Sequence, residues 1–410
     1  MTVQWKDMFS ANEALGTGPV SIDPYVSESY FELEREHLFK KSWLHVARAN
    51  EIPNPGDFIT REIEIAKASI IIVRGKDMKI RAFHNVCSHR AAKLVWVEKG
   101  SQGRFVCPYH AWTYDLEGSL RGVTGEDKFV GLDRKNCGLT PVACDLWEGF
   151  IFLNFDRQPK QTLAEFLGGF ADYASGYPFD DATSVAHLEF GDLHCNWKAA
   201  IDAFQESYHL GFLHKQTLTG VFSGKDNPLS DPLAFQTYGP HRTISLWANP
   251  DHKAGRVEKL SRQFGSTINS TTGETRAATQ AKLFAQAPGL NPARHPNWAL
   301  DVNVIFPHTI WLAIPGAFTV HHFWPITVNR TRYEAYSYYP EPKRASERFS
   351  REYGFCHFRG VVSEDVYNME FSQTAMESGA KKLLQLQESE ICIRHHLAAV
   401  DDHIRAEMVA

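Results

Sequence analysis

Two short stretches of the chain each place a cysteine close to a histidine. The first is Cys87-Ser88-His89 and the second is Cys107-Pro108-Tyr109-His110, with 17 residues between His89 and Cys107. Each pair offers one thiolate and one imidazole, which are common ligands of zinc and iron. The sequence therefore predicts a metal site with four ligands, supplied by two turns.

The order of these ligands, Cys-His-Cys-His, separates two kinds of metal site. Structural zinc sites normally present their cysteines together and their histidines afterwards. A Rieske [2Fe–2S] centre holds one iron with two cysteines and the other iron with two histidines. The order favours the Rieske centre, with a zinc site and packed core residues as the alternatives. Pro108 and the apolar flanks at residues 68–75 and 103–107 favour tight turns between short strands.

A second group of candidate ligands lies in the stretch NWKAAIDAFQESYHLGFLH. Read as a helix, Asp202, Glu206 and His209 fall on one face among apolar neighbours, which suggests burial. His209 and His214 reach a common metal only if the helix is distorted or ends near the following glycine. The ordinary alternative is a solvated polar face.

A 2-His-1-carboxylate iron site also needs an aspartate or a glutamate. Glu364 and Asp365 lie in the first turn of an expected helix, for which Ser363 is a plausible N-cap. Acids at this position are equally well explained as partners of the helix dipole. The residues by themselves leave the third ligand open.

The chain resembles the large subunits of Rieske ring-hydroxylating oxygenases. The cluster motifs of that family are C-x-H-R and C-x-x-H-x-W, and its iron motif is N-W-K followed by acid-x-Tyr-His-x4-His. This sequence matches them at Cys87, His89, Arg90, Cys107, His110 and Trp112, and at Asn196, Trp197, Lys198, Glu206, Tyr208, His209 and His214. Many members have aspartate where this chain has Glu206.

The resemblance implies two cofactors, a Rieske [2Fe–2S] cluster and a mononuclear Fe(II). The implied cluster ligands are Cys87, His89, Cys107 and His110, and the implied iron ligands are His209, His214 and Asp365. Asp365 is preferred over Glu364 because it lies five residues before the acid of a Met-Glu pair. Glu206 is implied to be a catalytic residue that bridges His209 and the His110 of a neighbouring chain.

The implied activity is that of a terminal oxygenase component, a Rieske-type non-haem iron oxygenase of class EC 1.14. It would act as a dioxygenase or monooxygenase in aromatic compound catabolism, and would dihydroxylate, monohydroxylate or O-demethylate an aromatic or similar apolar compound. No dinucleotide or flavin motif is visible, so the electrons must come from a separate reductase, with or without a ferredoxin. The resemblance also implies a homotrimer, with or without a small β subunit. A Rieske-type electron carrier without oxygenase activity is the alternative.

The expected fold is α+β, in three parts. Residues 1–42 form an N-terminal helical segment that packs on the catalytic domain, with an amphipathic helix within residues 23–48 and Ser27 or Ser29 as its N-cap. Residues 43–157 form a small antiparallel β Rieske domain, because short alternating runs are separated by turn residues. Residues 158–410 form a larger catalytic domain, in which an antiparallel sheet is covered by helices.

Composition excludes several classes of protein. With 43 basic and 48 acidic residues and a net charge of −5, the chain has no basic footprint for nucleic acid. No apolar run is long enough to cross a membrane, and the N-terminus has no secretory pattern. The five cysteines outside the two motifs are scattered, as in a reducing compartment. We therefore expect a cytoplasmic protein.

The second half of the chain offers candidates for a substrate pocket. The expected apolar lining residues are Val302, Val304, Phe306, Trp311, Leu312, Phe318 and Phe323. The expected polar contacts are His241, Arg242, His308, His321 and His322. Most such residues are simply core, so only a fraction of them should face a substrate.

Overall fold

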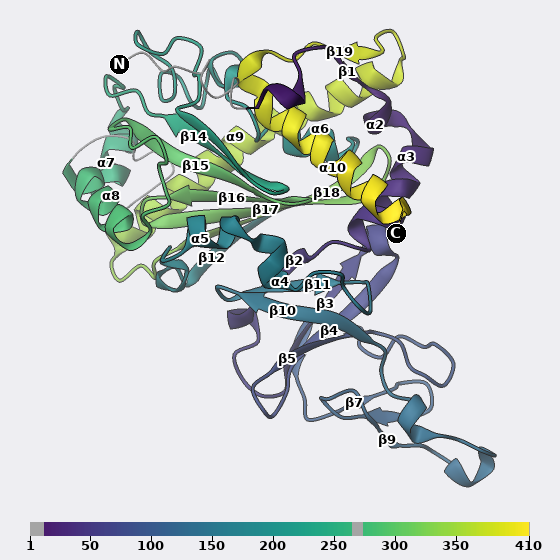
Figure 1. Cartoon of the computed structure of the whole chain (residues 1–410). Helices are drawn as coiled ribbons and strands as arrows, with labels where there is room; N and C mark the ends of the chain where they lie inside the picture. The colour runs from purple at the N-terminus through teal and green to yellow at the C-terminus, as the bar shows by residue number, and fades with distance from the viewer. Residues whose placement is uncertain (1–11, 265–273, 410) are drawn as a thin grey trace. The chain divides into compact units, whose positions relative to one another are not determined.

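The computed structural model describes residues 12–264 and 274–409 (Figure 1). It divides into two compact units. One comprises the described residues of Met1–Glu34 and Leu167–Ala410, and the other comprises Arg35–Phe166. The boundaries expected from the sequence, at 42/43 and 157/158, stay predictions, and residues 1–11 of the expected N-terminal segment lie outside the described residues.

The Arg35–Phe166 unit is built almost entirely from short antiparallel strands. Its seven-stranded sheet has the order β2-β11-β10-β5-β4-β3-β6, and a three-stranded sheet has the order β7-β8-β9. The strands are β2 (Leu44–Arg48), β3 (Asp57–Ile63), β4 (Ala68–Arg74), β5 (Ile80–His84), β6 (Lys99–Ser101), β7 (Phe105–Val106), β8 (Thr113–Tyr114), β9 (Leu120–Gly122), β10 (Pro141–Trp147) and β11 (Phe150–Asn154). The consecutive β-branched residues of β4 are buried on both faces of the sheet, which explains their unbroken apolar run.

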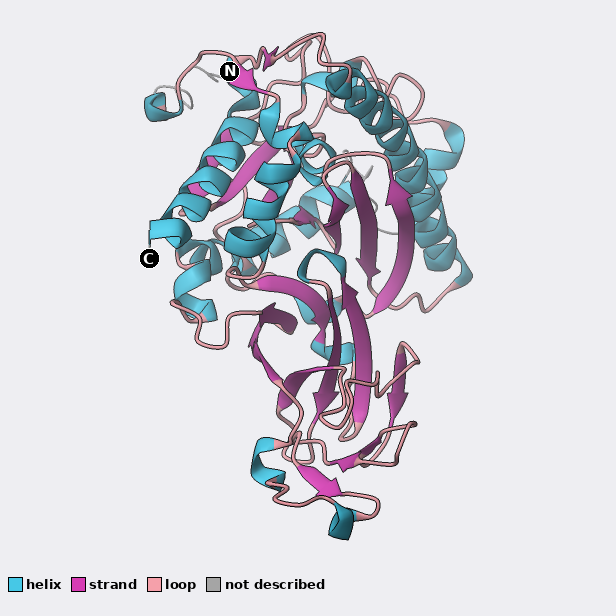
Figure 2. Ribbon diagram, turned by 90° about the vertical axis from the view of Figure 1, so that its right-hand side faces the viewer, coloured by secondary structure: helices cyan, strands magenta, loops and turns pink. Residues whose placement is uncertain are grey.

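The larger unit is organised around a seven-stranded antiparallel sheet of order β12-β18-β17-β16-β15-β14-β13. Its strands are β12 (Ser184–Leu193), β13 (Ala234–Tyr238), β14 (His241–Trp247), β15 (Trp298–Ile305), β16 (Thr309–Ile314), β17 (Ala317–Thr327) and β18 (Arg330–Tyr339). Figure 2 shows the helices of this unit beside its sheet. Its main helices are α5 (Gly169–Ala174), α6 (Trp197–Asp202), α7 (Arg256–Phe264), α8 (Glu274–Gln286), α9 (Ala345–Glu377) and α10 (Ile391–Val409). The expected α+β fold is confirmed.

The central strands of this sheet are buried on both faces. On β15, Asp301 accepts a hydrogen bond from the Tyr173 hydroxyl of α5 at 2.8 Å, so it points to the α5 side. Its neighbours Leu300 and Val302 point the opposite way, because successive side chains of a strand alternate. That opposite face receives α6, which packs on β17 and β18.

Three helices have boundaries that differ from those expected from the sequence. Within residues 23–48 the chain forms α2 (Asp23–Val26), α3 (Glu28–Leu33) and a π-helical turn before β2 begins, although Ser27 does cap α3 by accepting the Tyr30 N–H. The helix expected across residues 196–214 stops at Asp202. The helix expected to begin at Ser363 instead begins at Ala345, and the Ser363 hydroxyl donates to the Arg359 carbonyl within it. Ser363 is therefore not an N-cap.

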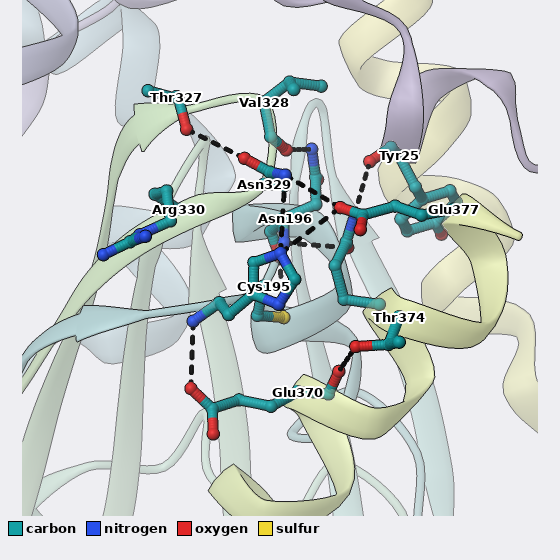
Figure 3. Close-up of polar contacts among 12 residues, drawn as sticks. Tyr25, Cys195, Asn196, Thr327, Val328, Asn329, Arg330, Glu370, Thr374 and Glu377 are labelled. Atoms are coloured by element: carbon teal, nitrogen blue, oxygen red, sulfur yellow. Dashed lines mark hydrogen bonds and ion pairs between the residues drawn. The ribbon is translucent and has the colours of Figure 1, made fainter.

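The start of α6 is tied to α9 and to the β17–β18 turn (Figure 3). Asn196 caps α6 by accepting the Lys198 N–H, and its own N–H donates to Gln373 of α9 at 3.0 Å. The Asn196 amide also donates to the Val328 carbonyl in the turn. Nearby, Glu370 of α9 accepts the His194 N–H at 3.0 Å. These contacts fix the segment that leads into the candidate ligands.

Among the residues that the structure describes, none of the helices is both long enough and apolar enough to cross a bilayer.

Candidate functional site

The two Cys/His pairs lie in two loops that fold in the same way. In each loop the cysteine N–H donates to the carbonyl five residues later, and the N–H four residues later donates back to the cysteine carbonyl. These distances are 2.9 and 3.0 Å for the loop of Cys87, and 2.7 and 2.9 Å for the loop of Cys107. The residue four positions after each cysteine, Ala91 or Ala111, has a positive φ of 55° or 57°. Two matching turns therefore present the four side chains.

The two histidines of these loops converge. The Nδ1 atoms of His89 and His110 are 3.1 Å apart, and Trp112 stacks on the His89 ring with centroids 5.0 Å apart. Desolvation lowers the pKa of His89, and the nearby His110 lowers it further. The neutral imidazole that a metal requires is therefore the favoured form.

The thiols of Cys87 and Cys107 lie in the same apolar core. Burial raises the pKa of the Cys87 thiol, so a thiolate there needs a cation beside it. The Tyr114 hydroxyl lies 3.2 Å from the Cys87 sulfur and accepts the Ser88 N–H at 3.0 Å, which fixes this loop. Two buried thiols and two converging imidazoles fit the donor set of a Rieske cluster.

His209, His214 and Asp365 also come together. One ligand atom from each lies within 4.8 Å of the other two. Asp365 Oδ1 is 3.0 Å from His214 Nε2 and 3.6 Å from His209 Nε2. His214 Nε2 and Asp365 Oδ1 are buried, and apart from each other and His209 Nε2, the third candidate ligand, neither atom has a polar partner within hydrogen-bond distance among the described residues. A metal ion bound between these atoms would supply the missing interaction, so the set fits mononuclear iron.

The early end of α6 is what brings the two histidines together. After Asp202 the chain turns and forms a short 3₁₀ helix, Tyr208–Gly211, which carries His209. Glu206 accepts the His209 N–H at 3.1 Å and so fixes this turn. Asp365 is supplied from the middle of α9, where its side chain is buried.

Each of these histidines has a carboxylate on its other ring nitrogen. His209 Nδ1 contacts Glu206, and His214 Nδ1 is 2.7 Å from Glu364 Oε2. A proton on Nδ1 leaves the Nε2 lone pair facing Asp365. Glu364 therefore lies on the far side of His214 and does not join the group of three that Asp365 completes.

A cavity of about 90 Å³ opens beside these three residues. It is lined by Ala203, Phe204, Glu206, His209, Leu210, His214, Leu218, Phe222, Leu246, Leu300, Val302, Leu312, Phe358, Val361, Val362 and Asp365. Leu246 pairs with Leu300 across β14 and β15, and Val302 pairs with Leu312 across β15 and β16, so these four make one apolar floor. Within the described chain, the ionisable groups of the lining are the three candidate ligands and Glu206.

The structure selects among the residues expected to meet a substrate. Val302 and Leu312 line the cavity, whereas Val304, Phe306, Trp311, Phe318 and Phe323 do not. None of the expected polar contacts, His241, Arg242, His308, His321 or His322, lines it. His321 instead lies 2.7 Å from the Thr319 hydroxyl and 2.8 Å from the Tyr333 hydroxyl, one on each ring nitrogen.

Sequence reasoning missed the contribution of α9 to the cavity. Phe358, Val361, Val362 and Asp365 all line it, at the spacing of one helical face. This i, i+3, i+4, i+7 pattern was visible in the sequence. It would also have indicated that the helix begins well before Ser363.

Two protein-family models match this chain, one for each of the two candidate metal sites. A family model for "Ring hydroxylating alpha subunit (catalytic domain)" matches residues 179–406, and one for "Rieske [2Fe-2S] domain" matches residues 42–136. The glycine betaine monooxygenase oxygenase subunit of Pseudomonas aeruginosa (strain UCBPP-PA14) is 32% identical over 214 residues, which are 52% of this chain and 48% of that protein. The chain thus spans about half the length of the curated relatives it matches.

Two solved structures share the fold along nearly the whole chain. The quaternary ammonium Rieske monooxygenase CntA has a TM-score of 0.73 at 23% identity, and covers 96% of this chain and 97% of its own. Naphthalene 1,2-dioxygenase from Rhodococcus sp. has a TM-score of 0.76 at 18% identity, with 98% and 97% covered. Because the catalytic-domain model alone covers more than half of its residues, the chain belongs to the ring hydroxylating alpha subunits, whose members combine a Rieske [2Fe–2S] domain with a catalytic domain that carries mononuclear iron.

Proposed function

We propose that this protein is the terminal oxygenase component of an oxygenase system. In this proposal His209, His214 and Asp365 hold Fe(II), and Cys87, His89, Cys107 and His110 hold the cluster. The observation that carries it is the convergence of His209, His214 and Asp365 at the edge of an apolar cavity. An electron carrier without oxygenase activity would need only the cluster ligands.

When bound, the two groups would supply the redox chemistry, namely single-electron transfer by the cluster and O2 binding by the iron. The protein's own side chains supply orientation and exclusion of water. Glu206 and Glu364 hold the imidazoles of His209 and His214 with Nε2 turned inward. The apolar floor on β14, β15 and β16 holds a substrate against the metal site without offering it a hydrogen bond.

The proposal includes partners that the resemblance implies. A separate reductase, with or without a ferredoxin, supplies the electrons. The chain assembles as a homotrimer, with or without a small β subunit, and Glu206 bridges His209 and the His110 of a neighbouring copy. The cytoplasmic location expected from the sequence stays a prediction.

For the substrate, the lining favours an uncharged apolar compound, such as an aromatic ring. The cavity wall carries aliphatic side chains and three phenylalanines, and the only carboxylates among its described lining residues are Glu206 and Asp365. Both carboxylates are already engaged with the candidate metal site. A zwitterionic substrate would need a cationic side chain for its carboxylate, and the lining described above has no lysine or arginine.

A quaternary ammonium compound is the second candidate. It is supported by the names of the glycine betaine relative and of the structural neighbour CntA. The faces of Phe204, Phe222 and Phe358 would be the groups that contact such a cation.

Two measurements on the reconstituted protein test these proposals. Iron analysis should give about three irons per chain for an oxygenase and about two for a carrier, because the mononuclear site adds one. Products are then identified under ¹⁸O2 with two panels, aromatic hydrocarbons and phenol ethers against glycine betaine, choline and carnitine. Any aldehyde released by dealkylation is reduced to its alcohol as it forms, so that its label does not exchange with water. Labelled product from the aromatic panel alone supports the apolar assignment. Labelled product from the ammonium panel alone rejects it, and no labelled product from any class would count against oxygenase function.

A further inference from the structure

We propose that Glu364 is a positioning residue that ties the ligand His214 to the chain segment lining the substrate cavity. The inference rests on the proposed iron site. One carboxylate oxygen, Glu364 Oε2, lies 2.7 Å from His214 Nδ1 and accepts the Thr217 hydroxyl at 2.6 Å. A single oxygen therefore joins a metal ligand on one side to the next segment of chain on the other.

The contact with His214 determines which nitrogen faces the metal site. When Nδ1 donates to Glu364, Nε2 is unprotonated and points to Asp365 Oδ1, 3.0 Å away. A carboxylate in this position also makes the imidazole a better electron donor to a metal. Glu364 does for His214 what Glu206 does for His209, although one acid comes from α9 and the other from the turn after α6.

The contact with Thr217 fixes the start of the cavity wall. Leu218 follows Thr217 directly, Phe222 comes four residues after Leu218, and both line the cavity. The Leu218 N–H donates to the His214 carbonyl at 2.9 Å, so the wall continues the ligand turn without a break. A second residue of α9, His357, contacts the Thr217 carbonyl at 2.8 Å through Nε2. His357 and Glu364 are seven residues apart and share one face of the helix, so two turns of α9 hold Thr217.

This double contact has a functional consequence. Any displacement of Leu218 and Phe222 on substrate binding is transmitted through Thr217 and Glu364 to the imidazole of His214. Conversely, loss of the Glu364 carboxylate should weaken the metal site and loosen the cavity wall together. If Glu364 only stabilised the fold, its loss would lower the stability of the whole protein and would not act specifically on metal affinity and on the cavity wall.

The test uses substitutions that remove the two contacts separately. Glu364→Gln and Glu364→Ala remove the charge or the whole group, and Thr217→Val removes only the hydroxyl. Glu352→Gln is the matched control, because Glu352 is an exposed carboxylate of the same helix that pairs with Arg351 away from the cavity. The proteins are prepared with an intact cluster and without mononuclear metal. Affinity for Co(II) is then measured by equilibrium dialysis with metal analysis, because the coloured cluster hides the weak visible bands of Co(II), and hydrogen exchange is measured over residues 215–225.

We expect Glu364→Gln to weaken Co(II) binding by about 10–100-fold, and Glu364→Ala to weaken it at least as much. Thr217→Val should leave Co(II) affinity close to that of the unmodified protein but speed exchange at Leu218 and Phe222. Glu352→Gln should change neither quantity. Unchanged Co(II) affinity in both Glu364 variants would overturn the role at His214, and unchanged exchange in Thr217→Val would overturn the tie to the cavity wall. If the unmodified protein fails to bind Co(II) at this site, the proposed iron site itself fails.

Discussion

The two candidate metal sites of this protein are built in opposite ways. The cluster ligands lie within 24 consecutive residues, Cys87 to His110, and each loop closes on itself through two backbone hydrogen bonds. The iron ligands come from two distant segments, with His209 and His214 in one and Asp365 in the other. The first site depends on local turns, whereas the second exists only when α9 is packed against the end of α6. The second site should therefore be lost first when the fold is disturbed.

The imidazoles of the two sites also present opposite nitrogens. His89 and His110 converge through Nδ1, whereas His209 and His214 turn Nε2 toward Asp365. In the second site the Nδ1 atoms are held by Glu206 and Glu364. Carboxylates therefore set the tautomers of the candidate iron ligands, and such partners strengthen metal binding.

The largest expected effect separates the two sites completely. Asp365→Ala should remove the mononuclear iron and all turnover, because the Fe(II) site needs a carboxylate ligand in addition to the two histidines. Iron content should fall from about three to about two per chain, and the red-brown cluster spectrum should persist because its four ligands are untouched. The control is Asp402→Ala, an exposed acid on α10. Full turnover in Asp365→Ala with a normal cluster would remove Asp365 from the site.

A smaller effect is expected where the two sites must communicate. Glu206→Gln, measured with the mononuclear site saturated with Fe(II), should slow reduction of the iron by about 10–100-fold, since the proposed bridging charge between two ligand imidazoles is lost. Single-turnover kinetics of the reduced protein measures this rate. A companion experiment co-expresses Cys87→Ala chains with Asp365→Ala chains, each inactive by itself. Mixed assemblies should regain part of the activity if electrons cross between chains, and no recovery in verified mixed assemblies would contradict the trimer proposal.

A still smaller effect is expected from a substitution that alters only the candidate cluster site. His89→Cys should retain a [2Fe–2S] centre and lower its reduction potential by roughly 100 mV or more, because a thiolate places more negative charge on the iron than a neutral imidazole. Redox titration followed by visible spectroscopy measures the shift. A colourless protein whose metal shows no redox change would instead indicate a zinc site.

The smallest expected effect concerns the scaffold of the iron site. Burial raises the pKa of Asp202 from 3.8 to about 7, and Tyr25 donates a hydrogen bond to it at 2.7 Å. Because the folded-state pKa is the higher one, stability from this group is complete below the unfolded pKa and is lost as the pH rises through the folded value. Between pH 5.5 and 7 the loss should be about 2 kcal/mol.

Asp202→Asn should remove this pH dependence, since asparagine still accepts the Tyr25 hydroxyl and does not ionise. Urea unfolding at pH 5.5 and pH 7 measures it, with Asp402→Asn as the exposed control. As the pH rises, the free energy of unfolding of the variant should increase relative to that of the unmodified protein. An equal pH dependence in both proteins would show that Asp202 is ionised in the fold throughout this range.

The sequence by itself determined the local features of this protein. The Cys-His-Cys-His order predicted a Rieske domain because all four donors lie in two short turns, whose shape depends on neighbouring residues. The alternating strands predicted an antiparallel β domain, and the resemblance to the oxygenase family, carried by the motif around His209 and His214, implied a mononuclear site. The match to the Rieske and ring-hydroxylating family models confirms these features at the level of the family.

Only the tertiary structure decided the features that depend on distant contacts. The helix expected to continue through Glu206 and His209 ends at Asp202, and α9 begins 18 residues before Ser363, so neither helix has the boundary expected from the sequence. Glu364 and Asp365 are adjacent and chemically alike, and only the packing of α9 shows that one faces His214 Nδ1 and the other His214 Nε2. The cavity floor likewise pairs Leu246 with Leu300. Residues 248–297 separate β14 from β15, so packing rather than a short hairpin turn sets the strand register that brings these two residues together.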